Sequence, residues 1–170
     1  MNALNLKLWI LSGIVGLILA FSGGAVLADG HFPKQAFLQQ KIAQKAAEVA
    51  LEKCRKDGYA VSVSIVDRSG VLKVVLRDDG AGPHTLGSSA GKAYTAASMK
   101  RATLGLANFI ADKPALHGLR DMDEKILILG GGLPIKIAGQ VVGGIGVGGA
   151  PGGHLDEACA TAGINSINSH

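Results

Sequence analysis

The chain has 170 residues, 48% of them hydrophobic, and a formal net charge of +4 at neutral pH. This length suits a single domain, and the apolar content is sufficient for a buried core. The basic residues are scattered along the chain without interleaved aromatic side chains. This pattern argues against a nucleic-acid-binding surface.

Residues 1–28 have the layout of a secretory signal. Lys7 precedes an uncharged apolar run from Leu8 to Phe21, and small residues follow as far as Ala28. A positive start, an apolar middle and a small-residue cleavage site are the features of such signals, and the run is shorter than the roughly 20 residues of a membrane-spanning helix. We therefore expect cleavage after Ala28 and a periplasmic or secreted domain of residues 29–170. An uncleaved membrane anchor is the alternative.

The two cysteines, Cys54 and Cys159, each lie among small apolar residues. This setting favours free buried thiols, because a buried cysteine behaves as a small hydrophobic residue. Export to an oxidising compartment also permits a disulfide, so the two alternatives stay open.

The first half of the expected domain predicts a helix followed by a hairpin. Apolar residues recur at three- and four-residue spacing over 34–57, and Gly58 follows as a helix terminator. Strands are predicted over 59–66 and 71–77, where apolar and polar residues alternate. The turn between them, Asp67–Gly70, is short enough to make the two strands antiparallel neighbours.

The second half predicts two helices, three strands and a closing helix. The helices are expected over 85–99 and 103–112, the strands over 125–129, 133–138 and 141–147, and the last helix over 156–166. Strands joined by tight turns exclude a doubly wound parallel sheet. We therefore predict an α+β fold, a five-stranded antiparallel sheet with helices packed on it, in the order α-β-β-α-α-β-β-β-α.

A glycine-rich run from Gly144 to Gly149 has the spacing of a dinucleotide-binding fingerprint, but no βαβ unit surrounds it. We interpret it as a strand that a helix or a neighbouring subunit approaches closely. The loop Gly148–Gly153 leads into a helix start that can hold a carboxylate ligand. The acidic residues Asp156 and Glu157 offer the alternative of a helix end capped from within the chain.

Three residues near the start of the helix predicted over 85–99 are candidates for binding. His84 follows a turn rich in glycine and proline, and an imidazole there can ligate haem iron or another transition metal. Lys92 and Tyr94 can supply a cation and a hydroxyl to an anionic ligand. The alternatives are a surface histidine, an exposed lysine and a core tyrosine.

The sequence has no Gly-x-Ser-x-Gly elbow, no phosphate-binding loop and no His-Glu-x-x-His motif. A conventional hydrolase or transferase centre therefore has no support, and no nucleotide cofactor is expected.

Six segments, taken in order from about residue 35 to residue 167, resemble the GlcG/HbpS family. They are Val66–Gly70, Arg77–Thr85, Lys92–Ala96, Gly130–Ile135, Val142–Val147 and Gly149–Cys159. The resemblance implies a profilin-like α+β domain that assembles as a homo-oligomer, often an octamer. It also implies binding of haem and iron by exported members, which work beside a redox-sensing two-component system with a membrane sensor as partner. Cytoplasmic relatives accompany glycolate metabolism, and a similar domain ends a corrinoid adenosyltransferase.

The resemblance also places residues at a haem site. Thr95 matches a position associated with an iron ligand in HbpS-like proteins, and His84 on the same segment is the alternative ligand. Lys92 or Arg101 would lie near the haem propionates. The main hypothesis is therefore an exported, oligomeric haem-binding protein. The alternatives are a binding or accessory protein, or an enzyme, for a small 2-hydroxy acid such as glycolate, and a structural oligomer or partner subunit without a small ligand.

Overall fold

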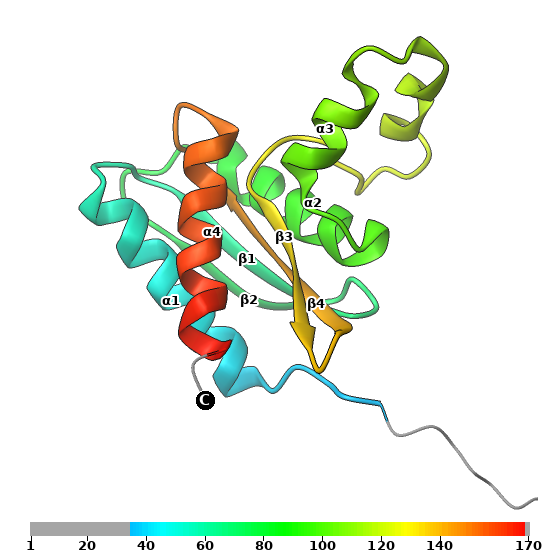
Figure 1. The fold of residues 1–170 in the computed structure, drawn as a ribbon. Coiled ribbons are helices and arrows are strands. Elements are labelled where there is room, and N and C mark those ends of the chain that lie inside the picture. Colours follow the sequence, from blue (N-terminus) through cyan, green and yellow to red (C-terminus); the bar gives the residue numbers. More distant parts are fainter. Residues whose placement is uncertain (1–34, 169–170) are drawn as a thin grey trace, which may run out of the picture. The chain divides into compact units, whose positions relative to one another are not determined.

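Residues 35–168, the part of the chain that this computed structural model describes, form an antiparallel sheet with helices on both faces (Figure 1). The predicted signal, residues 1–28, lies outside the described residues. None of the helices within 35–168 combines the length and apolar character needed to cross a membrane. The elements are α1 (Gln40–Lys56), β1 (Ser62–Asp67), β2 (Leu72–Arg77), α2 (His84–Met99), α3 (Thr103–Ala111), the 3₁₀ helix η1 (Pro114–Arg120), β3 (Gly132–Ile137), β4 (Gln140–Gly148) and α4 (Gly153–Asn168).

The sheet has four strands in the order β2-β1-β4-β3, and all neighbours are antiparallel. The α+β class and the two hairpins are confirmed, whereas the prediction of a fifth strand over 125–129 is wrong. Ile126 and Ile128 are buried in alternation, as in a strand, but they pack in a cluster with Leu106 and Ile110 beside the sheet. The alternation therefore reflects burial on one side of an extended segment, without a partner strand.

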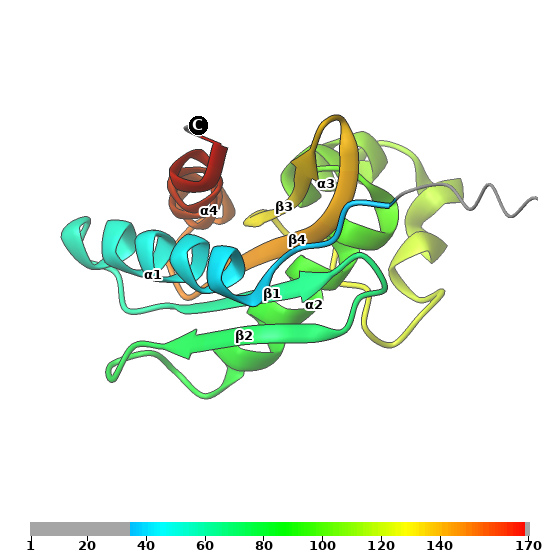
Figure 2. The ribbon, with the colours of Figure 1, turned by 90° about the horizontal axis from the view of Figure 1, so that it is seen from below.

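The two faces of the sheet are covered by different helices. Helices α1 and α4 lie on one face and α2 lies on the other (Figure 2). Strand β1 shows how the sequence divides the faces, because Val63 and Ile65 belong to the core beneath α1 and α4. Ser64 points the other way, and its hydroxyl lies 2.8 Å from the hydroxyl of Ser89 on α2.

Glycines on β4 let α2 approach the sheet closely. A Cβ atom at Gly144 would lie 2.2 Å from the carbonyl oxygen of Ala93, and one at Gly146 would lie 2.0 Å from that of Ser89. Any side chain at either position would push the helix away. The interpretation of this run as a strand with a close neighbour is confirmed, and the neighbour is α2.

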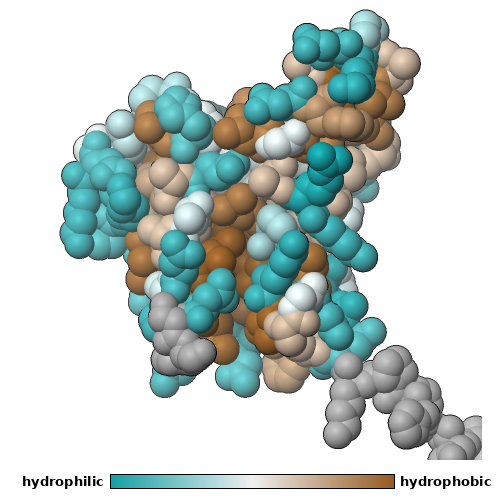
Figure 3. Space-filling view, in the orientation of Figure 1, coloured by the Kyte–Doolittle hydropathy of each residue, from teal (hydrophilic) through white to brown (hydrophobic). Residues whose placement is uncertain are grey.

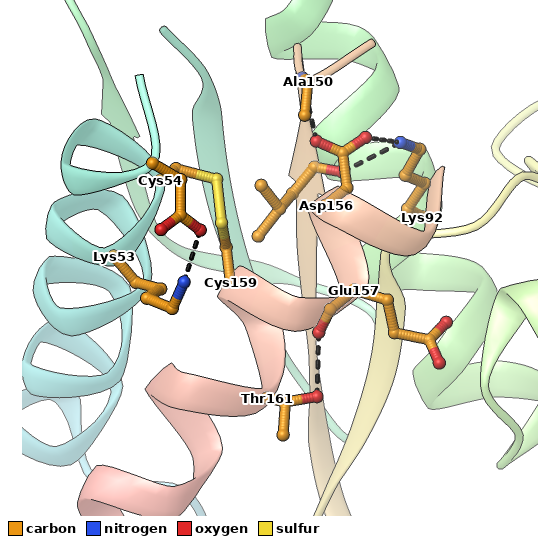
Figure 4. Close-up of a disulfide and its surroundings, with 10 residues drawn as sticks. Lys53, Cys54, Lys92, Ala150, Asp156, Glu157, Cys159 and Thr161 are labelled. Atoms are coloured by element: carbon orange, nitrogen blue, oxygen red, sulfur yellow. Dashed lines mark hydrogen bonds and ion pairs between the residues drawn. A yellow bond between two sulfur atoms is a disulfide. The ribbon is translucent and has the colours of Figure 1, made fainter. Parts of the chain in front are cut away.

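A disulfide joins α1 to α4 on the opposite face. Cys54 and Cys159 are fully buried and bonded, with their Cα atoms 5.6 Å apart (Figure 4). The favoured expectation of two free thiols is therefore wrong. The small apolar neighbours that suggested isolated thiols are the residues that let the two helices come within bonding distance.

Three local boundaries also differ from the sequence prediction. Helix α1 begins at Gln40 instead of residue 34, and residues 114–120, for which no element was predicted, form a 3₁₀ helix. Helix α4 begins at Gly153, three residues early, and the carbonyl of Gly152 accepts the amide protons of Leu155 and Asp156.

Candidate functional site

A cleft of about 920 Å³ lies on the side of α2 that faces away from the sheet. This volume is in the usual range of small-molecule and cofactor sites. One side is the turn between β1 and β2, and the other is the segment Glu124–Leu127, which begins in a turn and which we call the cleft wall. The lining residues are Val66, Ser69–Leu72, His84, Gly87, Ser88, Ala90, Gly91, Tyr94 and the cleft wall.

The floor of the cleft is a face of α2 made of small residues. Beyond its chain neighbours and the backbone of its own helix, Gly87 has nothing within 4 Å of the place where a Cβ would stand, so the helix is open to the cleft there. One turn later, a Cβ at Gly91 would lie 3.0 Å from the Cβ of Leu127. The cleft wall therefore rests almost directly on the helix backbone at that point.

Polar side chains stand at the ends of this floor. His84 is the first residue of α2, and its exposed ring folds back over Gly82. Tyr94 lies at the far end, where its ring packs against Gly70 in the β1–β2 turn. Gly70 has a φ of +78°, and the tight contact leaves no space for a side chain there. The ammonium of Lys125 lies 5.7 Å from the centre of the Tyr94 ring.

The structure brings together two of the five predicted site residues in this cleft, His84 and Tyr94. Lys92 lies on another side of α2, where its ammonium is 2.8 Å from the Asp156 carboxylate and 2.9 Å from the carbonyl oxygen of Val147 (Figure 4). Both side chains of this ion pair are almost completely buried. Burial raises the pKa of the Asp156 carboxyl above its ordinary value, and Lys92 opposes that shift.

Asp156 also answers the question about the glycine-rich loop before α4. Its second carboxylate oxygen accepts the amide proton of Ala150 at 3.0 Å. The loop before α4 therefore binds the carboxylate of Asp156 instead of a ligand carboxylate. This agrees with the second alternative, a helix end capped from within the chain.

Thr95 and Arg101 are not among the residues that line the cleft. Thr95 is completely buried, and its hydroxyl donates to the carbonyl of Gly91 and accepts the amide proton of Leu127. The guanidinium of Arg101 lies 5.0 Å from the centre of the Phe109 ring on α3. No ligand geometry tests these two assignments, and they stay predictions.

Comparison with known proteins gives the family of this fold. The family model described as "Haem degrading protein HbpS-like" matches residues 38–165. A crystal structure of a double mutant of HbpS from Streptomyces reticuli is 44% identical, with a TM-score of 0.74 over 80% of this chain and 90% of that one. The chain belongs to the HbpS-like family.

Two further relatives support the resemblance noted from the sequence. A crystal structure of a PduOC:haem complex is 30% identical to this HbpS-like chain, with a TM-score of 0.73 over 78% of this chain and 96% of that one. Protein GlcG of Escherichia coli K12 is 28% identical over 113 residues, which are 66% of this chain and 82% of GlcG. The predicted membership of the GlcG/HbpS family is confirmed.

The family implies haem, and the residues of the cleft fit this group. Haem is flat and largely apolar, carries carboxylates at one edge and needs a ligand for its iron. The cleft offers a floor of small residues and apolar sides that include Val71, Leu72 and Leu127. It also offers an imidazole from His84 and an ammonium from Lys125.

The sequence predicted the helix that forms the floor of the cleft, but it did not predict the two segments that form the sides of the cleft. Lys125 lies in a segment that was predicted only as a strand, and the β1–β2 turn was predicted only as a turn. One signal was available within α2: His84, Gly87, Gly91 and Tyr94 recur at three- and four-residue spacing, which places them on one face of a helix.

Proposed function

We propose that this HbpS-like chain is an exported, oligomeric haem-binding protein and that haem occupies the cleft on α2. One observation carries the proposal: the cleft has a floor of small residues, and its lining includes the imidazole of His84 and the ammonium of Lys125. The family and the haem complex of a relative with the same fold support this choice of ligand.

In this proposal His84 supplies the iron ligand. It stands at the open edge of the cleft with an exposed ring, and imidazole is the commonest protein ligand of haem iron. Bound haem would supply an iron centre able to change its oxidation state. The protein's own residues would hold the macrocycle against the α2 backbone and shield it from water on the sides.

Lys125 is the residue best placed to pair with the haem propionates. Among the residues that line the cleft it is the one lysine or arginine. Lys92 and Arg101 were predicted for this role, but the ammonium of Lys92 is held by Asp156 and Arg101 stacks on Phe109. The Tyr94 ring near the Lys125 ammonium would help to hold it at the edge of the cleft.

Two observations support export and self-association. Disulfides persist in oxidising compartments, so the Cys54–Cys159 bond agrees with a periplasmic or secreted location. Edge strand β2 and the turn before it expose Val71, Leu72 and Val75, and Figure 3 shows apolar side chains at the surface between α4 and β3. Such surfaces are suited to contacts between subunits. A membrane sensor as a further partner, and a role in redox sensing, are proposed from the family resemblance.

A hemin titration tests the proposed function. The unmodified protein should give a sharp Soret band that saturates at a defined ratio per subunit. We expect His84→Ala to shift this band and to weaken binding at least about tenfold, since it removes the iron ligand. His154→Ala is the matched control, because His154 is also an exposed histidine at a helix start and also folds over a glycine two residues earlier. Broad, non-saturating absorbance, or equal effects of both variants, would contradict the proposal.

The contact between Tyr94 and Lys125 also supports the second candidate, a binding protein for a small 2-hydroxy acid such as glycolate. A phenol hydroxyl and an ammonium together can bind a carboxylate. This candidate predicts a rise in the unfolding temperature with millimolar glycolate that Lys125→Met abolishes. An unchanged unfolding temperature would count against it.

A further inference from the structure

The buried hydroxyl of Thr95 connects α2 to the cleft wall. Thr95 follows Ser88 and Gly91 on one face of the helix, at spacings of seven and four residues. Its hydroxyl donates to the carbonyl of Gly91 at 2.8 Å and accepts the amide proton of Leu127 at 2.7 Å. The first bond is local within the helix, whereas the second reaches 32 residues along the chain.

The cleft wall has no place in the sheet, so it depends on other contacts for its position. Hydrogen bonds near it are local: the amide of Ile126 donates to the carbonyl of Asp123, and that of Leu129 donates to the carbonyl of Leu127. Ile126 is buried in the cluster with α3 and also borders the cleft, between the lining residues Lys125 and Leu127. The Thr95 hydroxyl therefore holds the wall at Leu127, which lies in sequence between the buried residues Ile126 and Ile128.

We propose that Thr95 is a positioning residue of the cleft. Its hydroxyl accepts the amide proton of Leu127 and so keeps the cleft wall close to α2. The side chains of Leu127 and Lys125 are thereby positioned to contact a flat ligand on the cleft floor. Thr95 acts through the wall and does not itself ligate the iron, since its proton is already donated to Gly91 and its side chain is completely covered. The choice of haem as ligand rests on the proposed function, whereas the hydrogen bond to the wall does not.

Three variants of the full chain test this role. Thr95→Val keeps the shape and removes the hydroxyl, and Thr95→Ser keeps the hydroxyl and removes a methyl group. Thr103→Val is the matched control, because the buried hydroxyl of Thr103 accepts the amide proton of Gly132 at 2.8 Å at a place that does not line the cleft. Amide exchange of Leu127 is measured without ligand, and the Soret maximum and hemin release rate are measured after loading.

The positioning role predicts a distinct combination of results. Thr95→Val should speed exchange of the Leu127 amide and hemin release by about tenfold each, the effect of one lost hydrogen bond. The Soret maximum at saturation should not move, and Thr95→Ser should restore both rates. Thr103→Val should leave the Leu127 amide and hemin release unchanged.

Other results would overturn it in distinguishable ways. A shifted Soret maximum in saturated Thr95→Val would make Thr95 an iron ligand. Unchanged protection of the Leu127 amide would remove the positioning role itself. If the unmodified protein gives no saturable hemin band, the proposed function fails, and exchange of the Leu127 amide still decides whether Thr95 positions the wall.

Discussion

The two faces of the sheet are built in opposite ways. On one face, α1 and α4 pack through a row of buried alanines and a buried disulfide between Cys54 and Cys159. On the other, α2 packs closely on the glycines of β4, but its outer side is left to a cleft of about 920 Å³. The wall of that cleft connects to α2 through the Thr95 hydroxyl. We therefore expect the disulfide-linked face to contribute most to stability and the α2 face to keep an open site.

The faces are nevertheless connected through the buried ion pair. Lys92 comes from α2 and Asp156 from the first turn of α4, so their contact links the helix of the cleft to the cross-linked helices. Gly131 makes this link possible, because a Cβ there would lie 2.6 Å from the Cβ of Asp156 and 3.2 Å from the Lys92 ammonium.

The largest expected effect comes from removing the disulfide. The bond spans 105 residues of sequence, and the chain-entropy model gives a bridge over such a loop about 4.7 kcal/mol of stability. We expect the double variant Cys54→Ala/Cys159→Ala to lose about that much in urea unfolding. At temperatures where it remains folded, its hemin affinity should be close to that of the unmodified protein.

Reductant provides the control for the disulfide prediction. Unfolding in reductant should lower the stability of the unmodified protein to that of the double variant and leave the double variant itself unchanged. Hemin binding that disappears while the variant is still folded would contradict the expectation that the disulfide stabilises the fold without shaping the cleft.

The next effect concerns the ion pair. Lys92→Met leaves the Asp156 carboxylate buried without its cation, which should cost about 3 kcal/mol. Adding Asp156→Asn removes the buried charge and keeps an oxygen for the Ala150 amide, so the double variant should be more stable than the single one. Urea unfolding of the two variants measures this difference.

The same pair of variants tests the predicted role of Lys92 at the propionates. Because Lys92 does not line the cleft, the double variant should keep its hemin affinity and stoichiometry. A loss of affinity in a folded double variant would instead support direct contact between Lys92 and the ligand.

A smaller effect separates the cleft floor from the rest of the protein. Gly87 and Gly105 both lie in helices with open space at the Cβ position. Replacing either with alanine should raise stability by about 0.5–1 kcal/mol. Only Gly87→Ala adds a methyl group to the cleft floor, so it alone should weaken hemin binding. Equal hemin affinities of the two variants would place the ligand elsewhere.

Side-chain periodicity predicted the elements of this fold, and tertiary contacts account for what it could not predict. Helix α2 and both hairpins follow from spacing along the chain. The expected strand over 125–129 failed because Ile126 and Ile128 alternate as in a strand, yet pairing depends on whether another strand is available. The state of Cys54 and Cys159 could not be predicted for a similar reason. Their neighbours in sequence are compatible with a free thiol and with a disulfide, and only the distance between the two helices decides.

The candidate site likewise has one part that spacing along the chain predicts and one part that depends on tertiary contacts. The cleft floor on one face of α2, with His84 and Tyr94 at its ends, follows from helical spacing. Lys125 enters from a segment 31 residues beyond Tyr94, and nothing in the intervening sequence indicates that the two side chains approach each other.

The smallest expected effect is a pH dependence at Glu157, which links α4 to the start of α3. Its carboxylate accepts backbone amide protons of Gly131 and Leu104, and one of its oxygens is buried without a hydrogen-bond partner among the described residues. Burial raises the pKa of Glu157 above the ordinary value of a glutamate. The folded state then binds a proton more readily than the unfolded state, so this group's contribution to stability falls as pH rises from about 4.3 through the folded-state pKa.

Replacing Glu157 with glutamine should remove this dependence. The difference in unfolding free energy between Glu157→Gln and the unmodified protein should therefore move in favour of the variant as pH rises through that window. Urea unfolding at a series of pH values measures it, and Glu52→Gln, which removes an exposed carboxylate on α1, is the control for loss of a charge. Parallel pH profiles for Glu157→Gln and the unmodified protein would show that the buried oxygen is hydrated, and the link between α4 and α3 would then be weaker than the two amide contacts indicate.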